Sequence, residues 1–251
     1  MTHFKKSLFS VLVCLVTINI SNAQCLAGDC TNGFGKFKNQ DRTFYAFFEN
    51  GVPSRMGLEF FLGFTIAYQI EDGNKHGIEV KYNPKGLFVI NQYENGLKNG
   101  YMLTGNYKKY SAQAYYYEND EKKHSLHSDF NAGKKKIKRY VACLGNCKEG
   151  LGLRRVDDSY YLGIFEKRKP TPIGVDLWKD SSEMYLGGAH NFVRKPFGIF
   201  YYEKSGYTYI GEFKKSKRDG IGVWISKEGV LTAYVMKKGK EKDLLYEEKL
   251  N

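Results

Sequence analysis

Apolar and polar residues alternate in short stretches along this chain, and the clearest example lies within residues 209–224. Tyr209, Gly211 and Phe213 occupy every second position, which places them on one face of a β-strand. The polar stretch 214–219 follows and is typical of a turn, and a glycine-rich apolar stretch then returns. The pattern predicts a β-hairpin.

The same hairpin pattern recurs at a fixed interval along the chain. Tyr161, Tyr185 and Tyr209, which begin three successive units, are equally spaced. A tyrosine followed two positions later by glycine starts each of the three units, and a further glycine follows in register. A fixed period of this size indicates a repeat architecture, in which each unit is one small element stacked on the next. The repeat positions are Tyr161, Gly163, Gly174, Tyr185, Gly187, Gly198, Tyr209, Gly211, Gly220 and Gly222.

Weaker copies of the unit extend in both directions at nearly the same step, with room for one more unit between positions 117 and 165. We therefore expect an all-β chain, an elongated single-sheet array of about ten consecutive antiparallel β-hairpins. At two strands per hairpin and ~4.8 Å per strand, it would be roughly 96 Å long. The tail, residues 241–251, is expected to form either a strand or a short capping helix.

Two cysteine clusters suggest that the chain is a duplication. Cys143 and Cys147, followed by a Gly-x-Gly, repeat the arrangement at Cys25 and Cys30. We expect two halves, residues 24–142 and 143–251, with the weakly repetitive, basic stretch before residue 143 as the seam. The seam is either a hinge or a continuation of the sheet, and both alternatives stay open. Cys14 lies in the N-terminal segment that we predict below to be removed on export, and four of the five cysteines remain. An even number in an exported chain favours two local disulfides, Cys25–Cys30 and Cys143–Cys147. A zinc site is less favoured, because the two distant pairs would have to converge.

The N-terminal segment, from Met1 to Ala23, has the pattern of a targeting sequence. Two lysines precede the apolar run Ser7 to Ile20, and a small-x-small site ends at Ala23. The run is too short to span a bilayer, so we predict a signal peptide, residues 1–23, cleaved after Ala23. A lipid anchor on Cys25 is the alternative, weakened by the large Gln24 before it. We expect an exported protein, periplasmic, surface-located or secreted, that is soluble or peripheral.

The hairpin unit resembles the MORN repeat, whose core reads Tyr-x-Gly-x-(Phe/Trp)-x-x-Gly-x-x-x-Gly-x-Gly. The resemblance is strongest over residues 161–224. The unit at 209 departs at Ser216, and the two units before it lack two internal glycines. The resemblance implies a non-enzymatic scaffold that attaches to membrane surfaces and assembles with other proteins.

The sequence contains no motif for catalysis, and we expect no enzyme, no cofactor and no metal site. It lacks a nucleophile elbow, a phosphate-binding loop and a metal-binding helix motif. His124 and His127 are expected to be a solvated pair. Trp178 and Trp224 are expected to pack on sheet faces, with a sugar-binding platform as the alternative.

Charge along the hairpin tips is the one feature that predicts a partner. The chain has a formal net charge of +12. The six residues after each strand should line up along one edge of a stacked sheet; these windows sum to +10 in the second half and −3 in the first. The basic tip row is Lys167, Arg168, Lys169, Arg194, Lys195, Lys214, Lys215, Lys217, Arg218, Lys237, Lys238 and Lys240.

A row of like charges recruits anionic partners, so we expect the basic tip row to bind an anionic lipid, an acidic envelope polymer or a protein partner. The alternative is that these are ordinary solvated turn residues, whose lysines protect sheet edges from pairing. Nucleic acid is a poor candidate for an exported protein. Two other functions stay open: a self-assembling structural protein in which acidic and basic tips of different copies pair, and a localising accessory of a secreted enzyme system.

Overall fold

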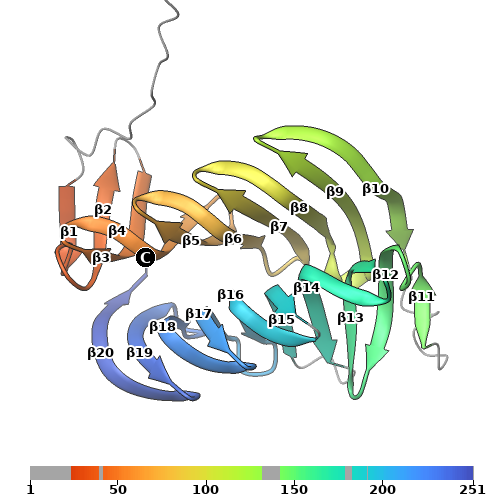
Figure 1. The fold of residues 1–251 in the computed structure, drawn as a ribbon. Coiled ribbons are helices and arrows are strands. Elements are labelled where there is room, and N and C mark those ends of the chain that lie inside the picture. Colours follow the sequence, from red (N-terminus) through yellow and green to blue (C-terminus); the bar gives the residue numbers. More distant parts are fainter. Residues whose placement is uncertain (1–23, 40–41, 132–141, 179–182, 191, 251) are drawn as a thin grey trace, which may run out of the picture.

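The computed structural model describes residues 24–39, 42–131, 142–178, 183–190 and 192–250. They form two ten-stranded antiparallel sheets, and within each sheet every strand pairs with the next one along the chain (Figure 1). The predicted signal peptide and most of the basic stretch before residue 143 lie outside the described residues.

The first sheet contains ten strands and a short 3-10 helix, η2, between its eighth and ninth strands. They are β1 (Gln24–Gly28), β2 (Phe34–Asn39), β3 (Arg42–Glu49), β4 (Val52–Phe61), β5 (Phe64–Glu71), β6 (Asn74–Tyr82), β7 (Leu87–Glu94), β8 (Leu97–Asn106), η2 (Tyr107–Lys109), β9 (Ser111–Glu118) and β10 (Glu121–Asn131).

The second sheet has the same meander topology. Its strands are β11 (Cys143–Gly145), β12 (Gly150–Val156), β13 (Ser159–Glu166), β14 (Lys169–Trp178), β15 (Glu183–His190), β16 (Val193–Tyr202), β17 (Tyr207–Lys214), β18 (Lys217–Ile225), β19 (Val230–Lys237) and β20 (Lys240–Lys249). In the described part of the chain no α-helix occurs, and no helix there has the length and apolar character needed to cross a membrane.

Tight turns explain why the chain folds back so regularly. Several tips consist of a residue with positive φ followed by glycine, such as Asn50-Gly51 and Asn95-Gly96. Positive φ at both central positions gives the hairpin turn that matches the twist of the strands, and asparagine and glycine tolerate it best. The predicted all-β fold, with antiparallel pairing of consecutive strands, is confirmed.

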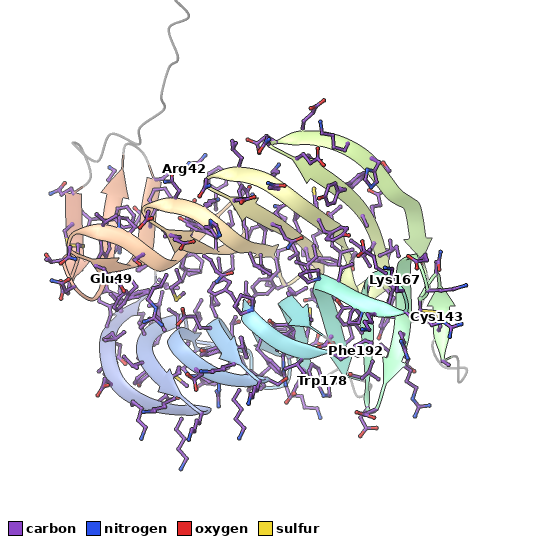
Figure 2. The ribbon with its side chains drawn as sticks, viewed as in Figure 1. Arg42, Glu49, Cys143, Lys167, Trp178 and Phe192 are labelled. Carbon is purple, nitrogen blue, oxygen red and sulfur yellow. A yellow bond between two sulfur atoms is a disulfide. The ribbon has the colours of Figure 1, made fainter. Side chains whose placement is uncertain are left out.

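The expected elongated single-sheet array is wrong, because the chain forms two ten-stranded sheets that pack face to face. One core contains apolar side chains from both sheets, including Leu58, Val80, Ile90, Leu186 and Ile210, and side chains fill the space between the layers (Figure 2). At ~4.8 Å per strand, each sheet is only about 45 Å wide. A sheet with an apolar face must bury that face, and here the other half of the chain covers it.

The sheets face each other in reversed strand order. β6 lies against β15 and β16, β8 against β14, and β2 against β20. β5 and β6 are the fifth and sixth strands of the first sheet, and β15 and β16 are the fifth and sixth strands of the second. β6 contacts β15 and β16 contacts β5, so the sixth strand of each sheet contacts the fifth strand of the other. The two halves are thus arranged with approximate two-fold symmetry.

Each sheet begins with the same disulfide-clamped hairpin. Disulfides join Cys25 to Cys30 and Cys143 to Cys147, as predicted. In both loops the side chain before the second cysteine, Asp29 or Asn146, accepts hydrogen bonds from the backbone amides two and three residues later.

The tail of the chain forms the edge strand β20, so the strand alternative was correct and the capping helix was wrong. β20 lies against the first hairpin of the other sheet: Lys36 Nζ is 2.5 Å from Glu248 Oε1, and the Tyr45 hydroxyl donates to Glu248 at 3.1 Å. These contacts close one end of the two-layer structure.

Candidate functional site

Successive hairpin tips are joined to each other along one edge of each sheet, called here the tip edge. Gly96 N donates to Lys75 O at 2.8 Å, and Arg168 N and Gly239 N donate in the same way to Lys148 O and Arg218 O. Because each bond joins one tip to the one before it, the tips form a continuous row.

The structure places nine residues of the basic tip row, with exposed side chains, at three tips of the second sheet: the tip between β13 and β14, the tip between β17 and β18, and the tip between β19 and β20. Within the described part of the chain, no carboxylate lies within the 4.0 Å ion-pair distance of any of the nine. The nine are Lys167, Arg168, Lys169, Lys214, Lys215, Lys217, Lys237, Lys238 and Lys240.

The other two described members of the basic tip row lie over aromatic rings. The guanidinium of Arg194 is 5.1 Å from the ring centre of Phe200, and that of Arg218 is 4.8 Å from the ring centre of Trp224. Arg218 also donates to Gly239 O at 3.0 Å. Both side chains are half-buried, and the contacts that they make are with other residues of the second sheet. The side chain of Lys195 lies outside the described residues.

These rings belong to the outer face of the second sheet, which points away from the first sheet. Tyr185, Phe200, Tyr209, Phe213 and Met236 form a separate apolar cluster there, with Trp178 and Trp224 packed against it. The predicted packing of both tryptophans on a sheet face is therefore correct.

The repeat tyrosines and glycines form one recurring contact on this face. A Cβ atom added to Gly174 would lie 2.2 Å from the Tyr161 hydroxyl oxygen, and one added to Gly222 would lie 2.3 Å from that of Tyr209. The Tyr161 hydroxyl donates to Ile173 O at 2.8 Å. Each tyrosine ring thus occupies the space that a side chain at the glycine position would need. This explains why tyrosine and glycine recur together at a fixed step.

The acidic tips of the first sheet lie on the same side of the molecule as the basic tips of the second. Arg55, close to the Asn50 tip, pairs with Glu212 near the Lys215 tip at 2.5 Å. Tyr101, near another first-sheet tip, donates to Glu166 beside Lys167. The tip edge therefore carries two parallel rows of opposite charge.

Acidic side chains also occur on the outer faces at the second position after a repeat glycine. Glu79, fully buried, pairs with Lys75 at 2.5 Å and accepts from Asn91 at 2.9 Å. Asp176 lies between Tyr161 and Tyr185 on neighbouring strands. Burial raises the pKa of Asp176 to about 7, and the positive charge of Arg194 only partly opposes this shift.

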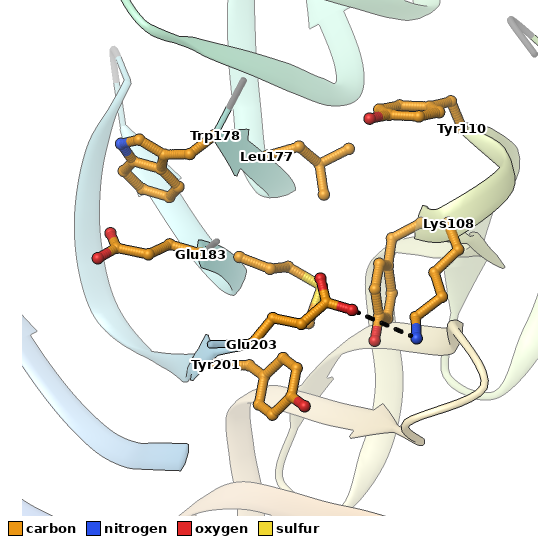
Figure 3. A pocket seen from close by; sticks show the side chains of 9 residues that line it. Lys108, Tyr110, Leu177, Trp178, Glu183, Tyr201 and Glu203 are labelled. Atoms are coloured by element: carbon orange, nitrogen blue, oxygen red, sulfur yellow. Dashed lines mark ion pairs between the residues drawn. The ribbon is translucent and has the colours of Figure 1, made fainter. Parts of the chain in front are cut away.

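A cleft of about 200 Å³ lies between the two sheets at the edge opposite the tips, called here the far edge (Figure 3). η2 of the first sheet forms one wall, and β14, β15 and β16 form the other. Four aromatic residues line it: Tyr107, Tyr110, Trp178 and Tyr201. The charged Lys108, Glu183 and Glu203 and the apolar Leu177 and Met184 complete the lining. The Trp178 ring itself packs on Phe200 at the outer face of the second sheet.

One far-edge turn of the first sheet is exposed and apolar. Between β4 and β5, Phe60, Phe61 and Leu62 are 40 %, 47 % and 81 % exposed. Leu62 has φ of 50°, nearly the value of Asn50 and Asn95 in the tip turns. A large apolar residue with positive φ in water is unfavourable on both counts.

Sequence reasoning missed the cleft, the apolar turn and the aromatic settings of Arg194 and Arg218. The turn had a readable signal, a Phe-Phe-Leu-Gly run where the neighbouring turns carry polar residues. The cleft had none, because its walls come from the two halves of the chain. Among the described residues no group of three or more metal-ligating side chains occurs.

No protein-family model matches the chain, and no curated protein matches its sequence. The similarity to solved structures is distant. A crystal structure of Kluyvelomyces marxianus Hsv2 shares 9 % identity, covering 78 % of this chain and 79 % of that one, with a TM-score of 0.21. BamB from Moraxella catarrhalis shares 10 % identity, covering 90 % and 74 %, with a TM-score of 0.19. Similarity this low carries no functional argument.

Proposed function

We propose that the protein is an exported, non-enzymatic scaffold that binds an extended acidic polymer along the basic tip row of its second sheet. The observation that carries this proposal is the set of nine exposed basic side chains, at three tips along one edge of the second sheet, that lack ion-pair partners among the described residues. Clustered like charges raise the local potential by several kT and attract polyanions. At ~4.8 Å per strand, the first and second of these tips are about 20 Å apart and the second and third about 10 Å apart, so the row offers several contacts along one edge.

The neighbouring acidic tips favour a polymer chain over a flat anionic surface. A membrane approaching the tip edge would meet Glu71 and Glu118 of the first sheet together with the lysines of the second. The two rows are about one sheet spacing apart, roughly 10 Å, which is close to the Debye length in physiological salt. A single extended chain can lie along the basic row alone and avoid the acidic one.

The recurring tyrosine–glycine contact supports the further proposal that the hairpins are MORN-type repeats. In the consensus, tyrosine and the last glycine stand where Tyr209 and Gly222 touch here. Scaffold function follows from that resemblance, since such arrays present long surfaces to partners. Self-assembly through paired tip rows, and service as an accessory of a secreted enzyme, remain alternative forms of the same scaffold role.

The test is binding of polygalacturonate, a linear carboxylated polysaccharide, by biolayer interferometry at low and high salt. We expect salt-sensitive binding that is lost when Lys214, Lys215 and Lys217 are changed together to glutamate. Arg218 is left intact because it supports Trp224. The matched control is a triple glutamate variant at Lys38, Lys85 and Lys109, which makes the same charge change at the far edge.

Equal loss of binding in both triple variants would show that only net charge matters, and the basic tip row would then be ordinary turn charge. Binding that resists salt would also contradict the proposal. Analytical ultracentrifugation over a range of concentrations tests the alternative of self-assembly. Concentration-dependent growth that disappears in the Lys214, Lys215 and Lys217 variant would favour pairing of tips between copies.

The apolar turn supports a second candidate, contact with a membrane surface at the far edge. Leu62 projects into solvent, and the guanidinium of Arg42 is 5.2 Å from the ring centre of Phe61. Exposed apolar residues with basic neighbours suit the interface of an anionic bilayer. Co-sedimentation with anionic liposomes should fall for Leu62→Asn but not for Leu97→Asn, which alters an exposed leucine on the tip edge. Equal binding by both variants would exclude this role for the turn.

A further inference from the structure

A groove on the outer face of the second sheet has the composition of a carbohydrate-binding site. This outer-face groove lies over β16 to β20, the last five strands in Figure 1. Its volume of about 420 Å³ equals the liquid volume of about 14 water molecules, enough for one or two sugar rings. Four aromatic residues line it, Tyr202, Tyr207, Trp224 and Tyr234, together with polar residues that include Thr232 and Glu241.

The strand register places the lining on a single face of the sheet. Trp224 lies opposite Tyr209, a member of the outer apolar cluster, and opposite Thr232 on its other side. Glu241 lies opposite Met236, another member of that cluster. The other rings of the groove pack against the same cluster or contact Trp224. Because opposite residues of paired strands share a face, the whole groove opens away from the first sheet.

The rings of the groove offer an accessible apolar surface. Tyr207 is 42 % exposed, and its ring centre is 6.4 Å from that of Trp224, with the two rings nearly perpendicular at 82°. Tyr202 lies 5.8 Å from Trp224 and is tilted by 32°. Aromatic side chains combine a rigid apolar body with a polar tip. The C–H face of a pyranose ring packs on such surfaces and leaves its hydroxyl groups free for hydrogen bonds.

Polar groups beside the rings can bind those hydroxyl groups. Glu241 is exposed, and within the described part of the chain no cationic group lies within 4.0 Å of its carboxylate. Burial raises the pKa of Tyr234, and the negative charges of Glu241 and Glu247 add to this, so its hydroxyl is neutral at physiological pH. A carboxylate accepts hydrogen bonds, and a neutral phenol both donates and accepts them.

Charges of opposite sign around the groove favour a neutral ligand. The guanidinium of Arg218 is 4.8 Å from the ring centre of Trp224, and Glu241 lies in the lining. A cation on the Trp224 ring would be repelled by Arg218, and an anion in the groove would be repelled by Glu241. A neutral molecule that is rich in hydroxyl groups avoids both costs.

We propose that the outer-face groove binds a neutral oligosaccharide of two or more units. The apolar face of one unit lies against Tyr207 and Trp224, and hydroxyl groups of another donate to Glu241. Tyr207 is in β17 and Glu241 in β20, about 14 Å apart across the sheet, so a single sugar ring cannot reach both. This site is independent of acidic polymer binding at the tip edge, so the failure of either proposal leaves the other unaffected.

The experiment uses tryptophan fluorescence, because the chain contains only Trp178 and Trp224. In a Trp178→Phe background the emission reports on Trp224 in the groove. The probes are three neutral tetrasaccharides: cellotetraose, maltotetraose and tetra-N-acetylchitotetraose. We expect a saturable change with at least one of them, with a dissociation constant of about 1 mM or lower, and at least tenfold weaker binding of the matching monosaccharide.

Two results would overturn the proposal. One is the absence of a saturable change with all three tetrasaccharides up to about 10 mM. The other is saturation by indole, an apolar aromatic probe, with affinity equal to or above that of the best tetrasaccharide. The glutamate variant at Lys214, Lys215 and Lys217 should bind the tetrasaccharide as the wild-type protein does, and loss of binding there would contradict a site on the outer face.

Variants test the groups of the groove. Tyr207→Ala should weaken tetrasaccharide binding about tenfold and Tyr207→Phe only slightly, because the ring provides the contact. Tyr115→Ala, at a half-buried tyrosine of the first sheet, is the matched control and should leave binding unchanged. Glu241→Ala should weaken binding severalfold, whereas Glu118→Ala, at an exposed acid of the first sheet, should not. Unchanged affinity in both Tyr207→Ala and Glu241→Ala would refute the assignment.

Discussion

Replacing Gly174 with alanine tests why each repeat combines a tyrosine with a glycine. The new Cβ atom would lie 2.2 Å, 2.3 Å and 2.5 Å from three atoms of the Tyr161 side chain, where ordinary contacts are 3.4–4 Å. The ring must therefore move by about 1 Å or more. It is 1 % exposed and its hydroxyl bonds to Ile173 O, so little space is free for such a shift.

The magnitude follows from two effects. Overpacking of this kind costs about 1–3 kcal/mol, and losing the hydroxyl bond adds about 1 kcal/mol. We expect Gly174→Ala to lower the free energy of unfolding by about 2–4 kcal/mol, or the melting temperature by about 5–15 °C for a chain of this size. Tyr161→Ala alone should cost about 3–5 kcal/mol, because it leaves a cavity.

The double variant, Gly174→Ala with Tyr161→Ala, tests whether the cost of the alanine comes from its overlap with the tyrosine ring. Without the tyrosine ring, the alanine methyl group at 174 has room, so the two costs should fall short of adding by about 2–3 kcal/mol. Guanidinium denaturation of the four proteins, followed by far-UV circular dichroism, measures this coupling. Strict additivity would refute the argument, since Gly174 would then be required for a reason unrelated to the ring above it.

Three further predictions concern stability. Asp176→Asn should stabilise the protein by up to about 4 kcal/mol at pH 8 and by little at pH 4. The raised pKa of Asp176 makes the folded wild-type protein lose stability as the pH rises from about 4 to about 7, and the asparagine variant does not suffer this loss. Denaturation at both pH values measures the difference. Leu62→Asn should leave the melting temperature unchanged or raise it, since asparagine suits its positive φ; a clear decrease would mean that the leucine is needed for folding. Cys143→Ser with Cys147→Ser should cost about 2 kcal/mol, the value for a loop this short, and a loss above about 4 kcal/mol would show that the clamp does more than close its loop.

Local features of this fold were predictable from sequence because short-range patterns determine them. The alternation around Tyr209 and the spacing of Cys143 and Cys147 predicted a hairpin and a disulfide, and both are present. The packing of one sheet on the other was not predicted, because it depends on residues far apart in the chain. A signal for it existed: Leu162 and Ile164 alternate with Tyr161 and Phe165, so both faces of that strand are apolar.

The candidate sites show the same limit. Charge counting found the exposed lysines of the tip edge, but it treated Arg218 as one more solvated cation. Its position over Trp224 depends on side-chain direction within the sheet, which charge alone does not reveal. The far-edge cleft brings Tyr107 of one half close to Tyr201 of the other, and no pattern within either half indicates that they lie together.

The exchange of strand contacts between the two sheets has a consequence for the origin of the chain. When β6 meets β15 and β5 meets β16, each half offers the other the same surface that it receives. This is the geometry of an isologous homodimer, in which two identical subunits bury one shared patch. An ancestral chain of ten strands could have formed this interface with a second copy of itself. Gene fusion would then have allowed the two halves to diverge, so that one set of tips became basic and the other acidic. Two identical subunits cannot differ in this way.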